Sequence, residues 1–110
     1  MSGNDGRIIV VLTTCGSRKE AEGLAKLVVN EKIAACAQVL GPIKSFYWWK
    51  DNLEEDEEWQ VLLKMPSENF ERACEFIKRH HSYELPEIVA IDVDNALSDY
   101  KAWVIKQSEK

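Results

Sequence analysis

The order of apolar and polar positions along the chain predicts alternating strands and helices. Residues 8–14 are apolar and mostly β-branched, which is typical of a buried central strand. Ser17 with Glu20 three positions later is a capping-box pattern, which predicts the start of a helix. One apolar stripe follows at helical spacing: Ala21, Leu24, Ala25 and Val28. The polar residues 30–32 are expected to end this helix.

The middle of the chain has the pattern of a hairpin. Residues 33–40 and 43–50 are strand-like, and Gly41-Pro42 between them predicts a bend or a bulge. A turn signal at Asp51-Asn52 leads back, through an acidic run, into a further strand at residues 59–65. These segments predict one long hairpin that is bent in the middle.

The last third predicts two helices and one strand. Pro66-Ser67 is expected to stop the hairpin and to cap a helix. Its apolar stripe consists of Phe70, Ala73, Cys74 and Ile77. A strand at residues 88–93 follows, and Ser98-Asp99 is expected to begin a C-terminal helix.

The order of these elements predicts an α+β fold. It is β-α-β-β-α-β with an extra C-terminal helix, which is the ferredoxin-like arrangement of a four-stranded antiparallel sheet with two helices on one face. No repeat or linker divides the chain. We therefore expect one domain over residues 1–110, with a short polar tail at residues 1–7.

The predicted hairpin is long enough to outreach its own sheet. Strands usually run about 3–10 residues, and an uncovered edge invites pairing with another chain. Large aromatic side chains concentrate on this hairpin: Phe46, Tyr47, Trp48, Trp49 and Trp59. The sequence therefore predicts a homo-oligomer whose hairpins pair between chains.

Composition narrows the classes of partner. The net charge is −5, which disfavours nucleic acid because such binding needs clustered basic side chains. The longest apolar run, residues 8–12, is far below the ~20 residues that cross a bilayer, and the polar start MSGNDGR shows no secretory signal. The 3 cysteines have no C-x-x-C spacing. We expect a cytoplasmic protein with free thiols and no membrane partner.

Candidate chemistry lies at the ends of two elements. His81 falls at the exit of the second helix, where a neutral imidazole suits copper or zinc. The alternative is a helix-end imidazole that bonds the last carbonyls. Cys15 ends the first strand just before a helix N-terminus, whose dipole is expected to lower the pKa of the thiol. His80 is expected at the surface, and Cys36 and Cys74 are expected to be inert core thiols.

Several separated segments together resemble the CutA family of divalent-cation tolerance proteins. They read VVLTT, EKIAACAQV, SFYWWKDNLEEDEEWQVLLK, HHSYELPEIVAIDV and DYKAW, and the resemblance as a whole runs over residues 8–107. The resemblance implies a ferredoxin-like homotrimer with β-pairing between hairpins, similar in architecture to the PII signalling proteins. It also implies binding of copper or another divalent cation such as zinc and a role in the response to metal ions. No settled enzymatic activity comes with the family, and we expect a protein that is not an enzyme.

The resemblance also bears on single residues. It places Glu58 at a family position implicated in metal contact, whereas the alternative is a solvated hairpin tip over residues 54–58. Some members carry a copper-associated cysteine at the position of Thr13, whereas this chain has Thr13 and Thr14, with Cys15 one residue further on. A shift of one residue along a strand changes the face, although the strand end, where Cys15 lies, is open to exceptions. The role of the family cysteine is therefore not carried over to Cys15. Ser82 stands where the family motif usually has proline, so we expect His81 to be held less rigidly.

Two further interpretations stay open. Tyr83, Tyr100 and Trp103 are expected either to line a cleft near the histidines or to pack in the core or a subunit interface. The alternative function is a PII-like signalling or interaction module that binds a small ligand or a protein partner in clefts between subunits. The chain has no glycine-rich phosphate loop and no evident nucleophile–base set.

Overall fold

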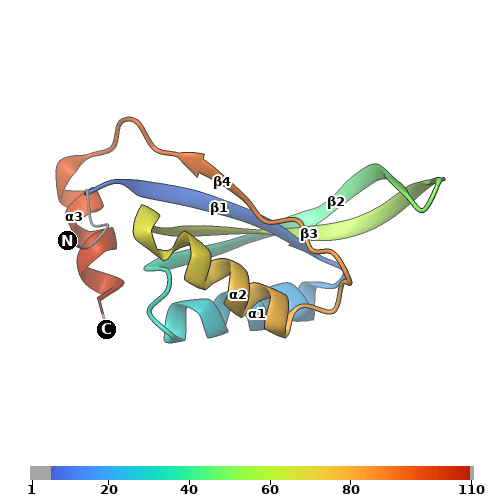
Figure 1. Ribbon diagram of the computed structural model, residues 1–110, viewed down its shortest axis with the longest axis horizontal. Coiled ribbons are helices and arrows are strands. Elements are labelled where there is room, and N and C mark those ends of the chain that lie inside the picture. Colours follow the sequence, from blue (N-terminus) through green and yellow to red (C-terminus); the bar gives the residue numbers. More distant parts are fainter. Residues whose placement is uncertain (1–5, 110) are drawn as a thin grey trace.

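Four strands form one antiparallel sheet in the computed structural model, which describes residues 6–109. The elements are, in chain order, β1 (Ile8–Cys15), α1 (Arg18–Asn30), β2 (Cys36–Trp49), β3 (Asn52–Pro66), η1 (Ser67–Asn69), α2 (Phe70–His80), β4 (Val89–Asp92) and α3 (Ser98–Gln107). The strand order is β2-β3-β1-β4, and α1 and α2 lie together on one face (Figure 1). This confirms the ferredoxin-like prediction. The tail predicted at residues 1–7 falls largely outside the described residues.

The core lies between the sheet and the helix pair. Every second residue of β1 faces the helices, and Val11 is 0% exposed. The predicted stripe of α1 is buried, as are Ala73 and Ile77 of α2. By contrast, all four residues of β4 are exposed, Ile91 at 52%. The sheet face without helices therefore leaves apolar side chains uncovered in the single chain.

The start of α1 follows the sequence pattern only in part. Ser17 Oγ accepts a hydrogen bond from the N–H of Glu20 at 3.1 Å, as a capping box requires. The Glu20 carboxylate does not complete the box, because it accepts two hydrogen bonds from Ser82. Glu20 therefore connects the first turn of α1 to a segment 62 residues further along the chain.

The second helix begins later than predicted. The residues after Pro66 form the 3₁₀ turn η1, and α2 starts only at Phe70. Asn69 precedes α2 without a capping hydrogen bond from its side chain, because its Nδ2 donates to the carbonyl of Ile33 at 2.8 Å. Ser67 therefore does not cap the α-helix, and this prediction was wrong.

The hairpin forms as predicted and reaches beyond the rest of the molecule (Figure 1). The strand register shifts between Leu40 and Ile43, which confirms the bulge at Gly41-Pro42. The turn is Lys50-Asp51, both with positive φ, one residue earlier than predicted. We call the part of the hairpin from Ile43 to Glu58 the arm.

The acidic run is not a hairpin tip. Residues 54–58 lie inside β3 and pair with β2, for example Glu54 with Tyr47 and Glu57 with Lys44. The side chains of a strand alternate between its two faces, so the run is split. Glu58 is 5% exposed, whereas Glu55 and Glu57 are exposed. The interpretation of residues 54–58 as a solvated hairpin tip is therefore wrong for Glu58.

No helix among residues 6–109 combines the length and the apolar character that a membrane crossing requires.

Candidate metal centre

His81 directly follows α2, and its side chain is 0% exposed. Its Nδ1 accepts a hydrogen bond from the N–H of Tyr83 at 3.0 Å. The neutral ring therefore carries its proton on Nε2, which donates to the carbonyl of Thr14 at 2.7 Å. The interpretation of a helix-end imidazole that bonds the last helix carbonyls was wrong, because the carbonyl partner belongs to β1.

The segment after His81 is held on two sides. Ser82 donates its N–H and its hydroxyl to Glu20, and the N–H of Tyr83 donates to His81. A proline at position 82 would have no N–H to donate. Serine therefore replaces the conformational restriction of proline with hydrogen bonds to α1.

Cys15 lies at the buried end of β1, and its Sγ is 3.8 Å from Nε2 of His81. Burial, with smaller contributions from Glu20 and Glu58, raises the pKa of Cys15 from 9.0 to about 12. The prediction that the helix dipole lowers this pKa was wrong, because desolvation and two carboxylates outweigh it. Thr13 and Cys15 are two residues apart and both 0% exposed, so the two side chains share one face of β1.

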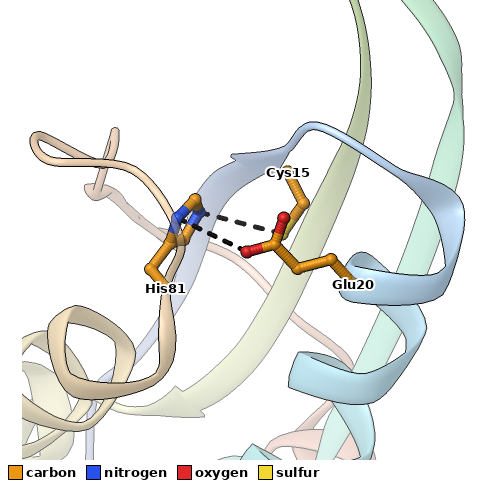
Figure 2. A group of neighbouring side chains, drawn as sticks. All are labelled: Cys15, Glu20 and His81. Carbon is orange, nitrogen blue, oxygen red and sulfur yellow. Dashed lines mark hydrogen bonds and ion pairs between the residues drawn. The ribbon is translucent and has the colours of Figure 1, made fainter.

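Glu20 completes a group of three that the sequence did not indicate. One ligand atom from each of Cys15, Glu20 and His81 lies within 4.8 Å of the others. Figure 2 shows the three side chains pointing toward one another from the end of β1, the first turn of α1 and the segment after α2. In the sequence, the capping-box position of Glu20 already accounts for a glutamate there. The spacing between Glu20 and His81 gives no sign that the two side chains meet.

Glu58 lies beside this group rather than in it. Its Oε2 accepts a hydrogen bond from the hydroxyl of Tyr83 at 2.8 Å, and the Tyr83 ring lies 4.8 Å from the ring of His81. Burial raises the pKa of Tyr83, and the hydrogen bond to Glu58 raises it further. Gly16 leaves room for this ring, since a Cβ there would lie 3.2 Å from the Tyr83 hydroxyl.

Tyr100 and Trp103 do not join the histidines. Their rings stack at 5.6 Å on α3, which lies at the end of the molecule away from the C-terminal end of α2 (Figure 1). Trp103 instead lines a groove of about 720 Å³ with residues of α1 and the start of β2, among them Ala25 and Cys36. Their placement in a cleft near the histidines was wrong, and only Tyr83 lies there.

The remaining candidates are ordinary. His80 is exposed and packs its ring on Phe76 at 4.4 Å, which confirms its surface position. The cysteines Cys15, Cys36 and Cys74 are free, as predicted. Cys36 and Cys74 are only partly buried, so their expected place in the core was overstated.

The donor set suits a soft or borderline metal ion. Thiolate, imidazole and carboxylate are the ligands that copper and zinc prefer, whereas magnesium and calcium prefer oxygen alone. A metal ion would compete with the protons on Cys15 Sγ and His81 Nε2, since only deprotonated atoms act as ligands. The residues present therefore fit such an ion.

Comparison with known proteins agrees with this chemistry. Residues 9–107 match the family described as CutA1 divalent ion tolerance protein. The chain is 38% identical to the divalent-cation tolerance protein CutA of Pyrococcus horikoshii, over 94% of this chain and 100% of that one. The Yersinia pestis protein of the same name is 36% identical, over 87% of this chain and 81% of that one.

Solved structures give the same result. The structure of the periplasmic divalent cation tolerance protein CutA from Archaeoglobus fulgidus superposes with a TM-score of 0.90 at 34% identity, covering 93% of this chain and 99% of that one. CutA1 from Ehrlichia chaffeensis superposes at 0.88 with 27% identity, covering 94% and 96%. The chain thus belongs to the CutA1 family of divalent ion tolerance proteins.

Proposed function

We propose that this protein binds a divalent metal ion, copper foremost and zinc next, and takes part in the cellular response to metal ions. The observation that carries the proposal is the meeting of a thiol, an imidazole and a carboxylate in one partly buried corner, within 4.8 Å. The names of the relatives point to divalent cations as a class. We propose no enzymatic reaction and no nucleic-acid partner.

The chain's own groups set the conditions for binding. His81 Nε2 donates to the carbonyl of Thr14, and an ion at Nε2 would replace that proton and end this hydrogen bond. The hydrogen bond from the N–H of Tyr83 to Nδ1 is kept and continues to orient the ring. The raised pKa of Cys15 keeps the thiol protonated at neutral pH, so uptake of an ion releases a proton. Affinity is therefore expected to rise with pH.

Native mass spectrometry of the reduced, chelator-treated protein tests the proposal. On titration with Cu²⁺ or Zn²⁺ we expect saturable uptake of one ion per chain by the unchanged protein and by His80→Ala. Uptake by His81→Ala should fall at least tenfold. No uptake by the unchanged protein, or equal uptake by His81→Ala, would refute the proposed site.

We further propose that the protein is a homotrimer, similar in architecture to PII proteins, and that it resides in the cytoplasm. The arm supports assembly, because Phe46 and Trp48 are 65% and 71% exposed in the single chain. The uncovered apolar face of β4 also supports it. The three free cysteines favour a reducing compartment, although the Archaeoglobus fulgidus relative is described as periplasmic.

The groove beside Trp103 favours a second candidate function. Its lining is mainly apolar, and Trp103 is 44% exposed there. A PII-like module would bind a small ligand or a protein partner at such a place. Two results would favour this candidate. The unchanged protein would take up no metal ion, and a bound ligand would protect the fluorescence of Trp103 from quenching.

A further inference from the structure

We infer that Glu20, rather than Glu58, supplies the carboxylate ligand of the metal centre, and that Ser82 holds it in position. This inference rests on the proposed function and deepens it. It concerns which side chain completes the site with Cys15 and His81.

Proximity favours Glu20. A carboxylate oxygen of Glu20 lies within 4.8 Å of ligand atoms of both Cys15 and His81. Figure 2 shows the Glu20 carboxylate turned toward the imidazole of His81. The three residues come from three different elements, so the site closes where β1, α1 and the end of α2 converge.

The hydrogen bonds of Glu20 orient its carboxylate and leave lone pairs on both oxygens free. The N–H of Ser82 donates to Oε2 at 2.9 Å, and the hydroxyl of Ser82 donates to Oε1 at 3.0 Å. A carboxylate offers about four lone-pair positions, so each oxygen keeps one for an ion. Outer partners of this kind fix a ligand's orientation in metal sites. Its side chain is 23% exposed, which leaves a route for an ion from solvent.

Glu58 has a different task. It accepts the hydroxyl of Tyr83, and the backbone N–H of the same Tyr83 orients His81 through Nδ1. Glu58 thus acts on the imidazole through Tyr83 and is a positioning residue. Removal of the Glu58 charge should mainly change how firmly the segment around Tyr83 is held. Its effect on the set of metal ligands should be smaller.

Cobalt(II) titration of matched variants tests the inference, because the visible spectrum of bound Co²⁺ reports the ligand set directly. Glu20→Gln should weaken binding at least tenfold and change the spectrum of the bound ion. Glu58→Gln should weaken binding less than threefold and keep the spectrum. Glu22→Gln, also on α1, is the control for lost charge, since its carboxylate pairs with Arg18 at the surface.

A purely structural role of Glu20 is tested by Ser82→Ala, which removes one of the two hydrogen bonds and keeps the carboxylate. We expect this variant to bind more weakly with an unchanged Co²⁺ spectrum. An unchanged spectrum and affinity in Glu20→Gln, with binding lost in His81→Ala, would overturn the inference and leave the proposed function standing. No binding of Co²⁺, Cu²⁺ or Zn²⁺ by the unchanged protein would overturn both.

Discussion

Tyr83 donates its hydroxyl hydrogen to Oε2 of Glu58 across 2.8 Å, and this bond ties the base of the arm to the segment that holds His81. Glu58 is 5% exposed, so its carboxylate has little access to water. Burying a charged group without a hydrogen bond is unfavourable. The tyrosine hydroxyl therefore matters for folding as well as for the orientation of the imidazole.

Tyr83→Phe is expected to lower the free energy of unfolding by about 1–3 kcal/mol, because it leaves the buried Glu58 without this donor. Tyr47→Phe is the matched control. Tyr47 also donates to a carboxylate, that of Asp56, but the pair is exposed, and surface changes cost about 0.5 kcal/mol or less. Urea unfolding of both variants measures the difference. Equal losses would show that burial of Glu58 does not govern the effect.

Gly41→Ala should destabilise the hairpin bend. A Cβ at Gly41 would lie 2.5 Å from Cδ1 of Trp59, so the indole must shift, and overpacking costs about 1–3 kcal/mol. Gly23→Ala is the opposite case, since nothing lies within 4 Å of its Cβ position in α1. Alanine in a helix is favoured over glycine by about 0.5–1 kcal/mol, so that variant should be stabilised. Thermal unfolding checks both signs, and a stabilised Gly41→Ala would contradict the contact.

Alkaline pH should destabilise the reduced protein partly through Cys15. Its folded pKa is raised from 9.0 to about 12, so the folded state holds the proton more firmly than the unfolded chain does. The stabilising contribution is complete below pH 9 and is lost as the pH rises from 9 towards 12. Unfolding free energies measured across that range should fall more steeply for the unchanged protein than for Cys15→Ser. Parallel curves would show that the thiol is not desolvated as the structure indicates.

Trp48→Lys should disrupt the proposed trimer. Trp48 is 71% exposed in the single chain, and a lysine on an interface would be buried without a partner. Sedimentation velocity is expected to show smaller species than for the unchanged protein. Leu27→Lys introduces the same side chain on α1, where the leucine is 42% exposed, and should leave the assembly intact. A monomeric unchanged protein would refute the trimer itself.

The fold was predictable because its signals are local. The β-branched residues of β1, the stripe of α1 and the Gly41-Pro42 bulge each depend on neighbours a few positions away. Such patterns also predicted that the hairpin would be long. They failed where a side chain had a distant partner, as when Asn69 bonded Ile33 instead of capping α2.

The site was only half predictable. His81 and Cys15 were identified by chemistry and position, and the structure brings them to 3.8 Å although 66 residues separate them. Glu20 was not identified, because its place in the capping box already explained it. Tyr100 and Trp103 were misplaced, because the sequence does not show at which end of the sheet α3 packs.

The sequence by itself determined the order of strands and helices, the buried stripes and the types of donor that the chain contains. The tertiary structure alone decided which donors meet, because strand register and helix packing set the direction of side chains at element ends. It placed the Glu20 carboxylate against Ser82 and His81, and it brought the Glu58 carboxylate into a hydrogen bond with the hydroxyl of Tyr83. It also decided the direction in which the pKa of Cys15 shifts, since burial raises this pKa where the sequence suggested that the helix dipole would lower it.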